Sequence, residues 1–132
     1  MTIDHMYRVA GVDKIAQAGA QAFFEKPEDT KKFLYGVRKD YKEKRDRMVS
    51  GLRRIGIDTY TPEGAFYLFP SIEKFAPNST EFVAAMIKNG VIVTPGYAFG
   101  PNGKGHIRVS YARSVDDIDE GLKRMESTMS SM

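Results

Sequence analysis

The chain has 132 residues, of which 42% are hydrophobic and 28% are charged, and these proportions fit one compact domain better than two domains or a disordered tail. It contains no cysteine, which excludes disulfides, thiolate zinc sites, iron–sulfur clusters and a cysteine nucleophile. The formal net charge is only +3 and no apolar run approaches the roughly 20 residues that span a bilayer, so neither a nucleic-acid partner nor a membrane anchor is expected.

Two helices are expected first. Apolar residues recur at three- and four-residue steps from Val12 to Phe23, so one narrow face of this segment is apolar and made mostly of small side chains. Pro27 ends this helix and suits the first turn of the next. A second apolar stripe runs to Ile55 and stops at Gly56, which predicts a helix of about 28 residues and about 40 Å. Part of so long a helix is expected to project beyond the chain's own core.

Residues 31–54 carry ten basic side chains against three acidic ones. A basic stripe of this kind can bind nucleic acid, but no stacking aromatics and no known recognition motif accompany it. The pairs Asp40 with Lys44 and Glu43 with Arg47 each place an acid four residues before a base, as on the exposed side of a long helix. We therefore interpret this segment as a solvated helix face.

Short β-prone runs follow the long helix. Residues 57–60 and 65–69 are expected to be neighbouring strands, because the turn residues of 61–64 separate them. Asn78 and Glu81 have the spacing of a capping box, and the apolar face that follows them predicts a helix that stops at a glycine.

Two further strands are predicted at 91–94 and 106–111. The loop 95–105 between them holds four glycines and two prolines. We expect it to connect the two strands without packing against the rest of the chain. Ser114 with Asp117 caps a last amphipathic helix. The predicted fold is therefore α+β, with a long linking helix followed by a small, mostly antiparallel sheet that helices cover on one side.

Few residues show a recognisable catalytic pattern. His5 and His106 are the only histidines, and neither has a second ligand at metal-binding spacing, so no metal site is predicted. Ser71 and Lys74 match an S-x-x-K pattern, but they stand between a strand and a loop and not at the start of a helix. The glycines of 95–105 lack the lysine followed by serine or threonine that a phosphate-binding P-loop requires.

Arg108 is the residue best suited to a binding role. Side chains alternate along a strand, so Ile107, Val109 and Tyr111 share one face and Arg108 points to the other. A guanidinium in a short strand either faces solvent or binds a planar anion, for which its rigid fork offers two parallel hydrogen bonds. The residues alone leave both interpretations open.

Three ordered motifs extend this interpretation. They are PEGAFYLFP at 62–70, GVIVTPGYAFG at 90–100 and GHIRVSYA at 105–112, followed by a closing amphipathic helix. In this order and at these separations they resemble the C-terminal small domain of pyridoxal-phosphate-dependent class I/II aminotransferases of the aspartate aminotransferase type. The resemblance implies the C-terminal domain of the PLP-dependent transferase fold.

The earlier segments fit the same family. DYKEKRDRMVSGLRRIGI at 40–57 resembles the helix that links the large and small domains, and IAQAGAQAFFEKPED at 15–29 resembles the helix before it. The resemblance divides the chain into an N-terminal remnant and helix from the large-domain side at 1–27, a linking helix at 28–56 and the small domain at 57–132.

The resemblance also implies roles. Arg108 stands where the family places the arginine that binds the substrate α-carboxylate, and Phe66 stands where an aromatic lines the substrate pocket, although ordinary strand core is equally open for it. The parent enzyme is expected to be a cytoplasmic homodimer that uses pyridoxal 5'-phosphate to move an amino group between an amino acid and a 2-oxo acid.

The family's Schiff-base lysine and its other cofactor residues lie upstream of the segment matching 15–29, and Lys14 and Lys74 are not in matching positions. We therefore expect a fragment that is inactive alone, with no catalytic, cofactor-binding or metal residue in this chain. The alternative is a stand-alone, non-enzymatic α+β module that binds a ligand or a protein. A fragment is expected to leave the apolar face of 12–23 uncovered and to self-associate, whereas a module is expected to be monomeric with this face packed.

Overall fold

The computed structural model describes residues 11–76 and 78–132, so His5 lies outside the described residues. The chain divides into two compact units, Met1–Arg38 and Lys39–Met132. None of the helices in the described part is both long and apolar enough to cross a membrane.

The first unit contains helix α2 (Lys14–Glu25) and the beginning of helix α3 (Pro27–Arg54). Asp13 caps α2, because its carboxylate accepts the backbone N–H groups of the helix's first turn at 2.9 Å. The rings of Phe23 and Phe33 meet edge to face across the corner between the helices, with centroids 6.2 Å apart. No residue of α2 is buried, and Ile15 is 87% exposed, so none of the described residues covers the narrow apolar face predicted here.

Helix α3 has the length and the limits that the sequence predicts. It runs without a break for 28 residues, begins at Pro27 and ends just before Gly56, whose φ of 88° is left-handed. The N–H of Ile57 donates to the carbonyl of Leu52 and that of Gly56 to Arg53, which is the hydrogen-bond pattern of a Schellman cap. All of its buried residues lie near its C-terminal end: Met48, Val49, Gly51 and Leu52.

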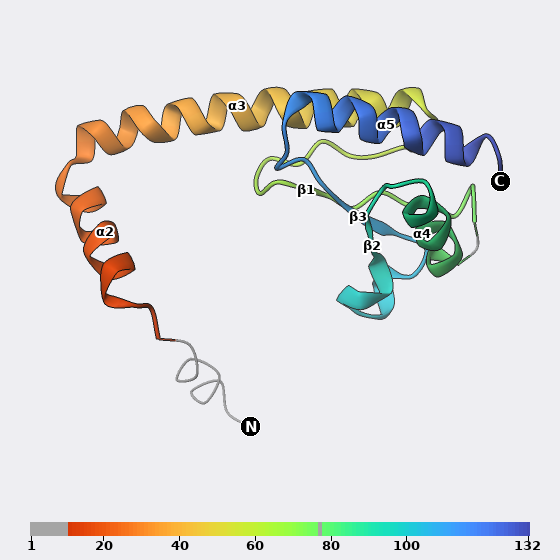
Figure 1. The fold of residues 1–132 in the computed structure, drawn as a ribbon, viewed down its shortest axis with the longest axis horizontal. Coiled ribbons are helices and arrows are strands. Elements are labelled where there is room, and N and C mark those ends of the chain that lie inside the picture. The colour runs from red at the N-terminus through yellow and green to blue at the C-terminus, as the bar shows by residue number, and fades with distance from the viewer. Residues whose placement is uncertain (1–10, 77) are drawn as a thin grey trace. The chain divides into compact units, whose positions relative to one another are not determined.

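The second unit holds a three-stranded antiparallel sheet in the order β1-β3-β2 (Figure 1). Its strands are β1 (Tyr67–Leu68), β2 (Thr94–Pro95) and β3 (Ile107–Ser110). The other elements are helices α4 (Ser79–Lys88) and α5 (Val115–Met129) and the short 3-10 helices η1 (Gly96–Phe99) and η2 (Pro101–Gly103). Asn78 and Ser114 cap α4 and α5 as predicted. The side chain of Asn78 accepts the N–H of Thr80 and not that of Glu81, so the predicted capping box does not form.

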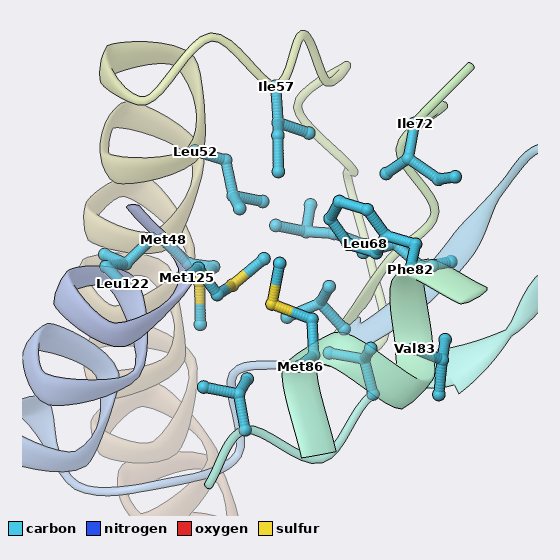
Figure 2. Close-up of a cluster of buried hydrophobic side chains, with 14 of the residues drawn as sticks. Met48, Leu52, Ile57, Leu68, Ile72, Phe82, Val83, Met86, Leu122 and Met125 are labelled. Carbon is cyan, nitrogen blue, oxygen red and sulfur yellow. The ribbon is translucent and has the colours of Figure 1, made fainter. Parts of the chain in front are cut away.

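One apolar core joins the sheet to these helices (Figure 2). Leu52 of α3, Phe82 and Met86 of α4, and Leu122 and Met125 of α5 contribute fully or almost fully buried side chains. The buried residues of β1 and β3 belong to the same cluster, so α3, α4 and α5 all cover one face of the sheet. The predicted α+β arrangement is therefore confirmed.

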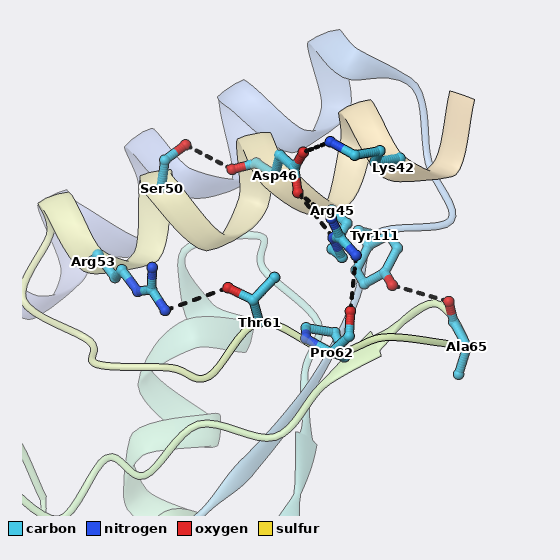
Figure 3. A network of polar contacts seen from close by, with 9 residues as sticks. All are labelled: Lys42, Arg45, Asp46, Ser50, Arg53, Thr61, Pro62, Ala65 and Tyr111. Atoms are coloured by element: carbon cyan, nitrogen blue, oxygen red, sulfur yellow. Dashed lines mark hydrogen bonds and ion pairs between the residues drawn. The ribbon is translucent and has the colours of Figure 1, made fainter. Parts of the chain in front are cut away.

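The prediction of a strand at 57–60 is wrong, and so is the predicted turn at 61–64 between two neighbouring strands. The guanidinium of Arg53 donates to the carbonyl of Thr59 at 2.6 Å, and that of Arg45 donates to the carbonyl of Pro62 at 3.0 Å. Figure 3 shows Arg45 and Arg53 reaching from α3 to this segment. The extended chain therefore takes its hydrogen bonds from arginine side chains, where a strand would need a neighbouring strand.

The other predicted strands shorten to two to four residues, and only Thr94 of the 91–94 segment is in one. On α3, Asp40 and Lys44 form the predicted ion pair at 2.7 Å. Arg47 pairs with Asp119 of α5, so the predicted pairing of Arg47 with Glu43 is wrong. Three arginines thus connect the C-terminal half of α3 to the rest of the second unit: Arg45, Arg47 and Arg53. The basic segment is therefore only partly a solvated face.

The close approach of α3 to α5 depends on Gly51. A Cβ at position 51 would lie 2.2 Å from Cδ1 of the buried Leu122, whereas a Cβ at Gly121 would meet nothing within 4 Å. We expect Gly51→Ala to lower the free energy of unfolding by about 1–3 kcal/mol because the core is overpacked. Gly121→Ala is the matched control and should raise it by up to about 1 kcal/mol through helix propensity. Urea unfolding measures both, and a stabilised Gly51→Ala variant would contradict this packing.

The ion pair between Arg47 and Asp119 predicts a pH dependence of stability. The hydrogen bond from Arg47 lowers the pKa of the Asp119 carboxyl below its ordinary value of 3.8. A lowered folded-state pKa stabilises the protein above the unfolded pKa, and this contribution is lost as the pH falls through the folded pKa. Asp119→Asn should therefore be less stable than the wild type at pH 7, and the difference should shrink as the pH is lowered toward 2, in urea unfolding at low salt. An equal difference at both pH values would show that the pair contributes no ionic stabilisation.

Candidate functional site

Arg108 lies at the centre of the sheet, on the middle strand. Ile107 and Val109 on either side of it are buried in the core, while Arg108 itself is half-buried on the opposite face. This is the alternation that the sequence predicts for the strand. On β2, Thr94 is the residue directly opposite Arg108, and on β1, Tyr67 is opposite Ser110.

Two aromatic rings lie against the Arg108 guanidinium. Its Cζ atom lies 4.5 Å from the centroid of the Tyr67 ring and 4.7 Å from that of the Phe99 ring. The single hydrogen bond found for it within the described residues runs from Nη2 to Oγ1 of Thr94, at a long 3.4 Å. No carboxylate of the described part forms an ion pair with it. Most of the five N–H donors of this half-buried guanidinium therefore have no partner among the described residues.

Phe99 is the last residue of η1, and the backbone of η1 packs closely against that of η2. A Cβ at Gly96 would lie 2.2 Å from the carbonyl oxygen of Gly103, and one at Gly103 would lie 2.0 Å from that of Gly96. Both glycines are buried, and Gly96 also donates its N–H to the carbonyl of His106 at 2.8 Å. The expectation that loop 95–105 does not pack is wrong, because its glycines permit backbone contacts that no side chain could.

Further aromatic side chains continue this surface. The ring of Phe69 meets that of Phe99 edge to face at 5.8 Å and stacks on His106 at 5.4 Å. Leu68 is buried, so Tyr67 and Phe69 on either side of it lie on the face of Arg108. Sequence reasoning missed this aromatic cluster, although the alternation around Leu68 could have indicated it.

Phe66 lies just before β1 and is 38% exposed, so it is not part of the core. Its ring is 4.4 Å from that of Tyr67 and 6.1 Å from that of Tyr41, measured between centroids. The Tyr111 hydroxyl donates to the carbonyl of Ala65 at 2.9 Å, a contact drawn in Figure 3. Burial raises the pKa of the Tyr111 phenol above its ordinary value, which keeps this donor protonated.

The alternative candidate residues do not form sites. Ser71 uses its hydroxyl on the backbone, donating to the carbonyl of Gly105 and accepting the N–H of Glu73, both at 3.4 Å, while Lys74 is exposed. His106 contacts the carbonyl of Lys104 through Nδ1. Within residues 11–76 and 78–132 no group of three metal-ligating side chains comes together.

The surroundings of Arg108 suit a carboxylate but not a pyridoxal phosphate group. Its neighbours are the side chains of Tyr67, Thr94 and Phe99, none of which can form an imine or pair with a ring nitrogen as a carboxylate. None of these neighbours of Arg108 is therefore assigned to that cofactor.

The family of the chain follows from comparison with known proteins. The pattern of the family described as Aminotransferase class I and II matches residues 2–125, so this protein belongs to that family. The aspartate aminotransferase of Pyrococcus horikoshii is 35% identical over 132 residues, which cover 98% of this chain and 33% of that relative. The chain spans about a third of the length of the curated relatives it matches.

Solved structures of aminotransferases share this fold. The crystal structure of an aromatic aminotransferase from Pyrococcus horikoshii matches 79% of this chain and 28% of its own, with a TM-score of 0.76 and 36% identity. An aspartate aminotransferase from Thermus thermophilus, solved with maleate, matches 77% of this chain and 26% of its own, with a TM-score of 0.73 and 30% identity. The resemblance inferred from the three motifs is confirmed.

Proposed function

We propose that this chain is the part of a pyridoxal-phosphate-dependent aminotransferase that binds the substrate α-carboxylate through Arg108. Its membership of the class I and II family supports the enzyme class. The observation that carries the binding role is a half-buried guanidinium that lies against two rings, with no carboxylate partner among the described residues. The substrates would be an amino acid and a 2-oxo acid, both of which carry a carboxylate next to the reacting carbon.

The chemistry of the site favours a carboxylate over other ligands. A guanidinium presents parallel N–H donors in one plane, which match the two oxygens of a carboxylate. Neighbouring rings remove water from its faces, so that the interaction is stronger than at an open surface. The related Thermus thermophilus enzyme was solved with maleate, a dicarboxylate, which supports this choice of ligand.

Phe66 is proposed to line the same substrate pocket. Its exposed ring adjoins Tyr67, which in turn lies on Arg108, so a substrate held by Arg108 would have an apolar surface beside it. Arg108 would fix the carboxylate end and Phe66 would contact the remainder of the substrate. Together they would orient the substrate and keep it from rotating, which is how positioning groups accelerate a reaction.

Arg108→Lys tests the carboxylate site in the enzyme that carries this chain. Lysine keeps the charge but loses the planar fork. Charge-assisted hydrogen bonds contribute on the order of 1.5–3 kcal/mol each, so kcat/KM for amino-acid substrates should fall roughly ten- to a hundred-fold. Cofactor affinity, measured by titration, should not change.

The matched control is an amine that lacks the α-carboxylate. Its slow reaction should be almost indifferent to Arg108→Lys, because it offers nothing to the guanidinium. Equal losses for the amino acid and the amine would assign Arg108 a structural role in place of the proposed one.

The isolated chain should neither transaminate nor form a specific imine with pyridoxal 5'-phosphate, because Lys14 and Lys74 do not stand where the family places its Schiff-base lysine. The measurement is borohydride reduction followed by mass spectrometry of the peptides. Scattered substoichiometric adducts on exposed lysines are expected. A stoichiometric adduct on one lysine would show that the chain holds the cofactor by itself.

A further inference from the structure

The two rings that lie against Arg108 come from different elements, and no other cation of the described residues is found over either ring. Tyr67 lies on β1 and Phe99 on η1, and both reach the same guanidinium at 4.5 and 4.7 Å. We propose that Tyr67 and Phe99 are positioning residues, a clamp that fixes the plane of the Arg108 guanidinium so that its N–H edge meets the substrate carboxylate. This inference rests on the proposed function of Arg108.

The clamp follows from the electronic structure of the partners. An aromatic ring carries negative charge on its face and attracts a guanidinium placed over it. The Cζ atom of Arg108 lies over both rings. A guanidinium held by rings can keep its in-plane N–H donors available, whereas a salt bridge would occupy them. Two rings in place of one carboxylate therefore hold the arginine still without neutralising it.

Each ring is itself held in place. The position of Tyr67 is set by the pairing of β1 with β3, in which Tyr67 lies opposite Ser110. Phe99 is supported by the edge-to-face contact with Phe69 and by the backbone contact between Gly96 and Gly103. Because neither ring depends on the substrate, the arginine is oriented before the substrate arrives, which lowers the entropy lost on binding.

Kinetics of the enzyme that carries this chain test the clamp. Phe99→Leu and Tyr67→Leu remove one ring each and should lower kcat/KM for an amino acid roughly three- to thirty-fold, the range expected for a partly desolvated cation–π contact. The reaction of an amine without a carboxylate should not change. Phe99→Tyr and Tyr67→Phe keep a ring and should stay within about twofold of the wild type.

Tyr97→Leu is the matched control, because Tyr97 lies on the same short helix as Phe99, is 55% exposed and has no contact with the guanidinium among those found in the described residues. It should leave both reactions unchanged. If Arg108→Lys is selective for the amino acid but the two leucine variants are not, the clamp is wrong and the carboxylate site stands. If Arg108→Lys is not selective, the proposed function fails first.

A spectroscopic readout on the 132-residue chain requires no activity. Protons above an aromatic face are shielded, so the side-chain Nε–H proton of Arg108 should resonate upfield of the other arginine Nε–H protons. It should move downfield in Phe99→Leu and in Tyr67→Leu and stay in place in Tyr97→Leu. An unshielded Arg108 resonance in the wild type would overturn the clamp even if the leucine variants fail to fold.

Discussion

The second unit depends on one constraint, the alternation of side chains along β3. Because β3 is the middle strand, both of its edges pair with neighbouring strands. This pairing fixes which side chains of β3 lie on each face of the sheet. Ile107 and Val109 fix one face to the core, and this forces Arg108 to the other. A shift of register by one residue would bury the guanidinium and expose both aliphatic side chains, so the fold and the site are specified together.

The core that holds β3 in this register comes from helices whose ends are fixed locally. Gly56 and Gly90 both have positive φ and both close a helix with the same pair of hydrogen bonds, from Gly56 and Ile57 after α3 and from Gly90 and Val91 after α4. These caps determine where each helix stops and the chain turns toward the sheet. A helix cap depends only on a few residues that are close together in the sequence. The ends of the helices could therefore be predicted from the sequence to within about two residues.

The strands and the site could be predicted only in part, because they depend on partners distant in the sequence. The residues 57–60 have the composition of a strand, but Arg53 supplies the donors that a strand partner would have supplied. The glycines of 95–105 suggest a flexible loop, whereas the contact between Gly96 and Gly103 makes them a packing element. The orientation of Arg108 follows from local alternation and was predictable, but the rings of Tyr67 and Phe99 meet it only through tertiary structure.

The exposed aromatic side chains on this face fit the proposed role of Arg108, because Tyr67 and Phe99 lie against its guanidinium. Tyr67, Phe69 and Phe99 are 37%, 42% and 51% exposed, and apolar surface left in water forgoes about 25 cal/mol of stabilisation for each Å². Folding alone would favour polar residues at these positions, since the opposite face already supplies the core. A ring is favoured at such a position where its face has a cation to attract, a substrate to contact or another protein surface to cover it. Under the proposed function, binding explains the composition of the face of β3 that lies opposite the core.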